Sequence, residues 1–273
     1  MGSGQPLVSV VMATYNEKPS IVQLAIRSIL EQTYHNFELL IFDDSTKPET
    51  INAINEMSKD VRVKIHRFNE RKGFVSSLNE GLRIAKGEFI ARMDGDDYSY
   101  PERFEKELTY LSKNPNVIVT GGQVDIMNEI GEITSHRSYP LGGVKLLLFS
   151  CFRNPLAHPT IMMRREIIDK GYRYNESLKM SEDLDFWLRL INDGYTISNL
   201  NDTLLKFRVQ DNFADKRVND VQRKYMSDVR KANFSINNPI HGFLSMMAGC
   251  LFKHVPADLI KRIYTNENKR GRK

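Results

Sequence analysis

The stretch EFIARMDGDD, residues 88–97, joins an apolar run to three aspartates that fall within four positions. The run from Glu88 to Asp94 predicts a strand of the core, because it is short, apolar and followed by a turn signal. Asp94, Asp96 and Asp97 lie so close together that their charges repel, and a hard divalent cation with oxygen ligands relieves that repulsion. The stretch therefore predicts a strand that delivers a turn binding Mg²⁺ or Mn²⁺, and the alternative is a solvated acidic turn that caps the next helix.

Outward from this stretch, strands and helices alternate along the first half of the chain. Apolar, β-rich runs predict strands at 7–15, 37–44 and 61–68. Helices are expected to begin at Pro19, Pro48, Phe74 and Pro101. Four strand–helix units in a row predict an α/β fold, with a doubly wound, mostly parallel central sheet and flanking helices.

The polar segments that follow the four strands are expected to meet at one edge of that sheet. Right-handed crossovers place the C-terminal ends of parallel strands on the same side. Open α/β sheets bind ligands in the crevice at that edge. The segments are TYNE (14–17), DDST (43–46), NERKG (69–73) and DGDD (94–97).

The second half of the chain has a looser pattern. Short strands with a hairpin turn are predicted within 117–137, a further strand at 157–164, and two final strands within 196–209. A helix is expected at 142–151, and Ser181 can cap another. The core face of that second helix is expected to hold Leu184, Trp187, Leu188 and Ile191.

The C-terminal part differs from the rest in charge. From residue 216 onward there are 13 Lys and Arg against 4 Asp and Glu, whereas residues 1–215 hold 26 against 30. The apolar segment 239–252 is too short to span a bilayer, and its basic flanks favour a helix lying on an anionic membrane surface. The alternative is a helical pair packed on the catalytic domain or on a second subunit, which leaves a homodimer open. Nucleic acid is disfavoured as a partner, because no recognition pattern accompanies the charge.

These patterns predict three parts of the chain and a place in the cell. Residues 1–120 and 121–211 are expected to form the two halves of one domain, and 212–273 a basic helical C-terminal extension. Cys151 and Cys250 form no CxxC pair, which indicates a reduced protein without a structural metal. With no signal peptide found, we expect a cytoplasmic protein, peripheral on the cytoplasmic face of the inner membrane.

The expected ligand at the sheet edge is a nucleoside diphosphate. No GxGxxG follows the first strand and no P-loop occurs, which disfavours dinucleotide oxidoreductases and P-loop NTPases. Tyr15 could stack on a base, Asp43 could accept an imino N–H, and the metal turn could hold a diphosphate, with Arg71 and Lys72 as cations nearby. Taken singly, each residue has a structural alternative. Tyr15 could be an aromatic residue at the rim, Asp43 could belong to an acidic turn, and Arg71 and Lys72 could lie in a solvated loop.

Four segments together resemble the family-2 glycosyltransferases, which have the GT-A fold. They are VSVVMATYNE, SILEQTYHNFELLIFDDST, NERKGFVSSLNEGLRIAKGEFIARMDGDD and SEDLDFWLRL, in the family's order, within a match that runs from about Val8 to Arg208. The resemblance implies a sugar transferase with a UDP-sugar donor, in which 1–120 is the nucleotide-sugar-binding half and 121–211 the acceptor-binding half of the same domain. It also implies a role in building bacterial O-antigen, capsule or exopolysaccharide.

The resemblance also implies residue roles. Asp94 and Asp96 match the DxD motif, which contacts the ribose and the metal on the donor diphosphate, with Asp97 in support. Asp183 matches the catalytic base, and its neighbour Glu182 is the second choice. Near the start of a helix, the helix dipole keeps such a carboxylate ionised and able to accept a proton. The other expected nucleotide-binding residues are Ala13, Tyr15, Glu17, Asp43, Lys72 and Arg208.

One position departs from the family pattern. The segment after the last strand is FRVQ, in which Arg208 is present but Gln210 stands where many members have a histidine near the metal. A third metal ligand supplied by the protein is therefore in doubt. His158 matches a segment that lines the acceptor side, although a lone histidine before a strand is commonly structural.

The function expected from these residues is an inverting, metal-dependent hexosyltransferase. It would move a hexose or N-acetylhexosamine from a UDP-sugar to a hydroxyl of a glycan acceptor linked to polyprenyl diphosphate. One alternative is a sugar-nucleotide pyrophosphorylase, but ATYNEKPS lacks the glycine-rich basic loop which that chemistry needs. The other is a catalytically silent nucleotide-binding protein or membrane scaffold, against which the intact DxD and Glu-Asp pairs argue.

Overall fold

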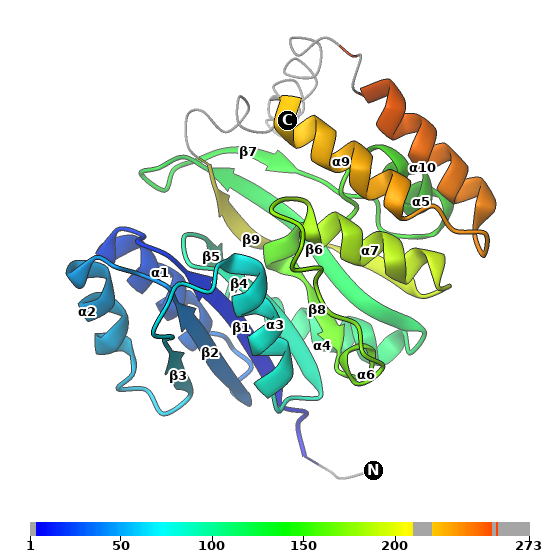
Figure 1. Ribbon diagram of the computed structural model, residues 1–273. Helices are drawn as coiled ribbons and strands as arrows, with labels where there is room; N and C mark the ends of the chain where they lie inside the picture. Colours follow the sequence, from blue (N-terminus) through cyan, green and yellow to red (C-terminus); the bar gives the residue numbers. More distant parts are fainter. Residues whose placement is uncertain (1–3, 210–219, 253–254, 256–273) are drawn as a thin grey trace.

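The computed structural model describes residues 4–209, 220–252 and Val255 (Figure 1). Within these residues nine strands form one sheet in the order β3-β2-β1-β4-β8-β6-β9-β5, and β7 pairs with β6. The strands are β1 (Val8–Thr14), β2 (Phe37–Asp43), β3 (Val63–His66), β4 (Phe89–Asp94), β5 (Tyr98–Ser99), β6 (Val117–Met127), β7 (Ile133–Arg137), β8 (Met162–Arg164) and β9 (Thr196–Arg208).

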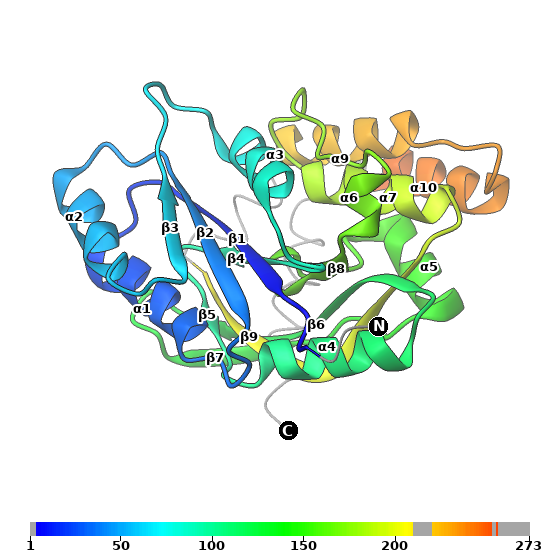
Figure 2. The same cartoon turned by 90° about the horizontal axis from the view of Figure 1, so that it is seen from below.

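Helices cover both faces of this sheet. They are α1 (Pro19–Leu30), α2 (Pro48–Met57), α3 (Phe74–Ile84), α4 (Arg103–Lys113), α5 (Gly143–Phe152), α6 (Glu166–Asp169), α7 (Glu182–Asn192), α9 (Asp220–Ala232) and α10 (Pro239–Phe252), with a 3₁₀ turn at His158–Thr160. Figure 2 shows α1, α2 and α4 on one side of the strands and α3, α6 and α7 on the other.

The first half follows the expected parallel pattern. β1 lies between β2 and β4 and is parallel to both, and β3 extends the sheet beside β2. All seven residues of β2 are buried, as expected for a strand covered by helices on both faces. Helix α3 packs so closely on β1 that a Cβ on Gly81 would come within 2.3 Å of Val11 Cγ1. A larger residue at position 81 would therefore push α3 off the sheet.

The second half adds antiparallel pairs to the sheet. β8 runs antiparallel to β4 and β6, and β5 runs antiparallel to β9, while β6 and β9 are parallel. The prediction of two final strands within 196–209 is wrong, because β9 is one strand. Its segment 200–202, which includes Asn201 and Asp202, bulges out of the β6–β9 ladder, where Gly121 pairs with Asn199 and Gln123 with Thr203. The composition of this segment predicted a turn between two strands, whereas the structure has a bulge within one strand.

Three other local predictions need correction. The strand predicted at 157–164 is confined to β8, because the segment around Pro159 forms the 3₁₀ turn. The helix expected from Pro101 begins two residues later, at Arg103. Ser181 precedes α7 but makes no capping hydrogen bond, because its backbone is left-handed with φ +63°.

Two apolar cores lie on opposite faces of the sheet. One joins α1, α2 and α4 to the inward residues of β1, β2 and β4. The other joins α3, α6 and α7 to the opposite face, with Trp187 of α7 fully buried in it. The four residues predicted as the core face of α7 are all buried, which confirms that prediction. Because both faces are packed, the carboxyl ends of β1, β2 and β4 are held together at one edge.

Helices α9 and α10 form an outer layer beside α5 and α7 (Figure 1). Asn233, just after α9, donates to Asp185 of α7, and its carbonyl accepts from Asn192 of the same helix. In the part of the chain that the structure describes, none of the helices has the length and apolar character needed to cross a bilayer.

Candidate active site

A small cavity of about 160 Å³ opens at the carboxyl ends of β1 and β4. Five predicted residues line it: Ala13, Tyr15, Glu17, Asp94 and Asp96. Arg71, expected as a nearby cation, lines it as well, and Asp44, Gly73 and Phe74 are lining residues without a predicted role. The expectation that the polar segments after β1, β2 and β4 converge is confirmed.

The loop before α3 covers this cavity because Asp44 holds it. The Asp44 carboxylate accepts hydrogen bonds from the backbone N–H groups of Lys72 at 3.3 Å and Gly73 at 2.7 Å. Gly73 has φ +83°, a conformation that favours glycine. The same loop places the Arg71 guanidinium 3.8 Å from the centroid of the Tyr15 ring. The exposed ring of Tyr15 thus has a cation on one face, within the usual range of a cation–π contact.

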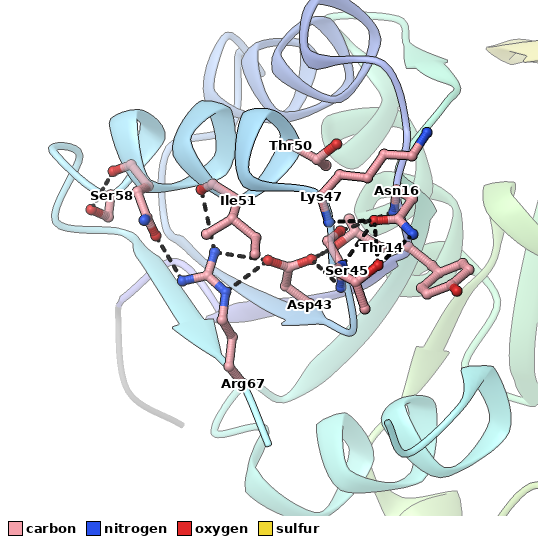
Figure 3. Close-up of polar contacts among 12 residues, drawn as sticks. Thr14, Asn16, Asp43, Ser45, Lys47, Thr50, Ile51, Ser58 and Arg67 are labelled. Atoms are coloured by element: carbon pink, nitrogen blue, oxygen red, sulfur yellow. Dashed lines mark hydrogen bonds and ion pairs between the residues drawn. The ribbon is translucent and has the colours of Figure 1, made fainter. Parts of the chain in front are cut away.

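Asp43 is a buried structural link in this conformation (Figure 3). Its carboxylate accepts from Thr14 Oγ1 and the Ser45 N–H, each at 3.0 Å, and pairs with Arg67 at 2.7 Å. The side chain has no exposed surface. Asp43 therefore ties the end of β1 to the loop after β2 and to Arg67, and it does not line the cavity.

Asn16 fixes the neighbouring turn. It has φ +60°, and its side-chain oxygen accepts from the backbone N–H groups of Thr46 at 2.8 Å and Lys47 at 3.0 Å. These bonds join the TYNE and DDST segments, as Figure 3 shows. Asn16 and Ser181 are the two residues other than glycine with positive φ in the described chain, and both lie at this site. Such strain is commonly found where a function holds it in place.

Four carboxylates converge beside the cavity. Ligand atoms of Asp94, Asp96 and Asp97 all lie within 4.8 Å of one another. Burial, and then the charges of Asp94 and Glu17, raise the pKa of Asp96 to about 7. Burial also raises the pKa of Asp97, whose Oδ2 is buried and has no hydrogen-bond partner among the described residues. Hard oxygen donors, mutual repulsion and an unpartnered carboxylate oxygen fit a divalent cation.

Arg92, which the sequence analysis did not single out, balances part of this charge. Its guanidinium forms two hydrogen bonds to the Asp94 carboxylate, one of them at 2.7 Å from Nη1 to Oδ2. The side chain is almost fully buried, and its Nε has no partner among the described residues. In the sequence, the signal for Arg92 was a charged residue inside the otherwise apolar run that forms β4.

A second cavity of about 170 Å³ connects the acidic turn at 94–97 to α7. Arg92 and Asp94 line one part of it, and Glu182 and Asp183 line another. Asp94 thus borders both cavities. The structure brings the expected base to the expected metal end across a stretch of sequence of almost ninety residues.

The carboxylates of α7 are held at the first turn of that helix. Asp183 Oδ1 accepts from the Leu184 N–H at 2.7 Å, and its Oδ2 accepts from the side-chain amide of Asn154. Burial, followed by the charge of Asp183, raises the pKa of Glu182 to about 7. The pair therefore combines one anchored carboxylate with one that binds a proton near neutrality.

Arg208 braces the acidic turn at 94–97. Its backbone N–H donates to Asp97 Oδ1 at 2.7 Å, and its Nε donates to the Asp96 carbonyl at 2.8 Å. Its Nη1 donates to the Asn128 and Glu129 carbonyls in the β6–β7 turn. Arg208 thus lies where expected, although its guanidinium bonds the protein backbone.

Two further residues of the sequence analysis do not line the cavity at the ends of β1 and β4. Lys72 lines a different, larger cavity between α3 and the segment 173–176. His158 lines the α7 cavity and bonds the Tyr174 hydroxyl at 2.8 Å, and burial holds its pKa well below the usual value. Gln210 lies outside the described residues.

Comparison with known proteins identifies the family. The model of glycosyl transferase family 2 matches residues 9–172. The O-antigen biosynthesis glycosyltransferase WbnJ of Escherichia coli is 34% identical over 216 residues, which cover 77% of this chain and 82% of that protein. The amylovoran biosynthesis glycosyltransferase AmsE of Erwinia amylovora is 27% identical over 267 residues, 96% of this chain and 100% of that protein. The chain belongs to glycosyl transferase family 2 and is a glycosyltransferase.

Solved structures of low sequence identity share the fold. Staphylococcus aureus TarS in complex with UDP-GlcNAc has a TM-score of 0.69 at 19% identity, over 90% of this chain and 72% of that chain. The mannosyltransferase PcManGT of Pyrobaculum calidifontis, in complex with GDP-Man and Mn²⁺, has a TM-score of 0.67 at 15% identity, over 98% and 85%. The predicted GT-A architecture is confirmed.

Proposed function

We propose that this glycosyltransferase is an inverting, metal-dependent enzyme that moves a hexose or N-acetylhexosamine from a UDP-sugar to a glycan hydroxyl. The observation that carries the proposal is the cavity shared by Asp94 and the Glu182–Asp183 pair. A sugar bound there would have its leaving diphosphate at the acidic turn and its acceptor at α7. One displacement with one base at the acceptor side inverts the anomeric centre.

At the donor end, Tyr15, Ala13 and Glu17 would bind the nucleoside with Arg71 and Lys72 nearby. Asp96 and Asp94, with Asp97 in support, would hold Mn²⁺ or Mg²⁺. When bound, the cation neutralises charge that builds on the departing diphosphate. Asp43 and Arg208 serve the nucleotide indirectly in this proposal, because Asp43 fixes the end of β1 and Arg208 fixes the metal-binding turn.

At the acceptor end, Asp183 would take the proton of the attacking hydroxyl. Its two hydrogen bonds, from Asn154 and Leu184, aim the carboxylate and favour its charged form. Glu182 beside it is the second candidate. We assign residues 1–120 to the donor, 121–211 to the acceptor and 212–273 to a basic extension.

The names of two relatives support the proposed acceptor class. AmsE and WbnJ carry names from amylovoran and O-antigen biosynthesis. We propose that this chain likewise acts in bacterial surface polysaccharide synthesis. Its acceptor would be linked to polyprenyl diphosphate, at the cytoplasmic face of the inner membrane. The donor complexes of TarS and PcManGT contain a nucleotide sugar, and that of PcManGT also contains Mn²⁺.

Calorimetric titration with UDP, GDP, dTDP and CDP tests the donor end. We expect selective UDP binding that needs Mn²⁺, is abolished by EDTA and is lost in Asp96→Asn. Asp169→Asn on α6, an exposed aspartate remote from the cavities, is the matched control and should bind as the wild type does. Nucleotide binding that ignores both the metal and Asp96 would overturn the proposal.

Turnover of the accepted UDP-sugar tests the acceptor end. Asp183→Asn should lower kcat by roughly 10²–10⁴-fold, the usual contribution of a general base, while UDP binding persists. NMR of the product should show an inverted anomeric configuration. Full turnover in Asp183→Asn would refute this assignment of the base.

A further inference from the structure

Helix α10 exposes its large apolar side chains and buries its small and polar ones, the reverse of what is usual for a helix on the surface of a protein in water. Its inward face carries small and polar residues, among them His241, Ser245 and Ala248. Its outward face carries Ile240, Phe243, Leu244, Met247 and Leu251. These positions are spaced by three or four residues, so they form one stripe along the helix.

The exposed fractions define this orientation. Ile240 is 76% exposed, Phe243 53% and Leu251 60%, whereas Ser245 and Ala248 are each 2% exposed. Water favours the opposite arrangement, with the large apolar side chains inside. A continuous exposed apolar stripe of this kind marks an interaction surface.

Specific contacts fix the helix in this orientation. His241 bonds Ser150 of α5 at 2.8 Å, and Ser245 accepts from Arg230 of α9 at 3.3 Å. A Cβ on Gly249 would lie 3.3 Å from the Arg230 side chain. The small face is therefore fitted to α5 and α9, and rotating the helix to bury the stripe would break these contacts.

The neighbouring helix α5 has the same character. It exposes Val144, Leu148 and Phe152, which are spaced by four residues. Two residues beyond its end, Asn154 donates to Asp183. Helix α5, with its own exposed apolar row, is thus followed at once by Asn154, which holds the proposed base Asp183.

The charge around these helices selects the partner. No acidic residue occurs in α5 or anywhere between Asp228 and Asp258, and the chain from residue 216 onward is strongly basic. A second copy of this chain would bring two such basic extensions together against their repulsion, whereas an anionic lipid surface attracts them. A row of apolar side chains without nearby acids matches an interfacial helix.

We propose that the outward faces of α10 and α5 dock on an anionic bilayer, with Phe243, Met247 and Leu251 inserted among the lipids. The docked surface lies beside the α7 base, so a lipid-linked acceptor would approach it from the membrane. That consequence rests on the proposed function, whereas the docking itself does not.

Flotation of the full chain with vesicles tests the docking. We expect binding to phosphatidylglycerol–phosphatidylcholine vesicles, little binding to phosphatidylcholine alone, and weakening as salt rises. Phe243→Ser/Leu251→Ser should lower the partition coefficient by about tenfold or more, because less apolar area is inserted. Val61→Ser/Ile133→Ser removes two apolar residues elsewhere, each at least half exposed, and should leave the coefficient unchanged.

The remaining outcomes separate this proposal from others. Equal vesicle binding by the two double variants would overturn it. A wild-type dimer that Phe243→Ser/Leu251→Ser converts to a monomer, without vesicle binding by either, would assign the face to a second copy and also overturn it. UDP and Mn²⁺ binding measured without lipid tests the transferase separately, and should be the same in wild type and in Phe243→Ser/Leu251→Ser.

Discussion

Asp94 is the residue on which the two cavities of the site meet, and Arg92 holds it in place. The bidentate contact orients the carboxylate, and the buried positive charge offsets the repulsion from Asp96 and Glu17. Arg92 also lowers the pKa of Glu182 against the larger effect of burial. One cation thus acts on both ends of the proposed reaction.

Removing Arg92 should therefore shift the pH dependence of the enzyme. Without the cation, carboxylates at both ends bind protons more tightly, so the acid limb of kcat/KM should move to higher pH in Arg92→Met. Arg92→Lys keeps the charge but loses the planar fork, so it should reduce activity with a smaller shift of the limb. Rates between pH 5 and 9 measure both effects. An unshifted limb in Arg92→Met would show that Arg92 has no electrostatic role.

Glu182 predicts a second pH effect. Its raised pKa of about 7 means that the pair on α7 carries a proton below that pH and is fully charged above it. With Mn²⁺ and UDP-sugar saturating, kcat should rise with pH through about 7, and this limb should disappear in Glu182→Gln. Asp193→Asn, at the far end of α7, is the control that should keep the wild-type profile. A wild-type limb in Glu182→Gln would assign the titration to another group.

The position of individual residues at the sheet edge was more predictable than their burial. Tyr15 and Asp94 were expected to meet because strand ends share an edge, and both line one cavity there. Asp183 was expected from the family resemblance, and the roles of all three residues stay predictions. The direction of a side chain beyond a strand end has no period in sequence. The burial of Asp43 and the turn of Lys72 toward another cavity therefore required the structure.

Among the elements, α4 carries a buried charge pair that fixes it under the site. Arg103 Nε bonds Glu107 at 3.1 Å, and both side chains are fully buried. The Arg103 guanidinium also donates to the Arg92 carbonyl at 2.9 Å. The pair thus connects α4 to β4, the strand that leads into the acidic turn.

Breaking this pair should cost far more stability than replacing it. Glu107→Ala leaves the Arg103 charge buried and unpaired, and should lower the free energy of unfolding by about 3–5 kcal/mol. Arg103→Met/Glu107→Leu replaces both charges with apolar volume and should restore most of that loss. Urea denaturation of the wild type and both variants measures this. Similar losses in the two variants would show that the hydrogen bonds of Arg103 matter more than its charge.

Long, strongly patterned elements were predictable, and short or exceptional ones were not. The apolar runs of β1, β2 and β4 and the proline starts of α1 and α2 indicated those elements correctly. β5 has two residues and hence no period. The bulge in β9 has the composition of a turn. The apolar content of α10 suggested a surface helix, but only packing shows that its large side chains point outward.

At the scale of the whole molecule, one sheet joins the two halves of the domain, 1–120 and 121–211. Packing of β4 against β8, and of β8 against β6, makes the described strands continuous across both halves. The single tryptophan, Trp187, lies buried in the second half. It can therefore report on ligands bound to the first half.

Donor binding should stabilise the region around Trp187. UDP with Mn²⁺ at 100 times its Kd should add about 2.7 kcal/mol to the free energy of unfolding. The urea transitions followed by Trp187 fluorescence and by far-UV circular dichroism should coincide and shift together. EDTA should cancel the shift. A shift seen by circular dichroism alone would mean that the two halves unfold separately.

The contact between Asp97 and Arg208 spans 111 residues of sequence. A ribosome makes the acidic turn early and the brace late, so the nascent chain carries its three aspartates long before the residue that fixes them has been synthesised. β5, which follows the turn, also waits for its partner β9. The braced acidic turn can therefore form only after residue 208 has been synthesised, and a shorter nascent chain lacks the contacts that hold the three aspartates in place.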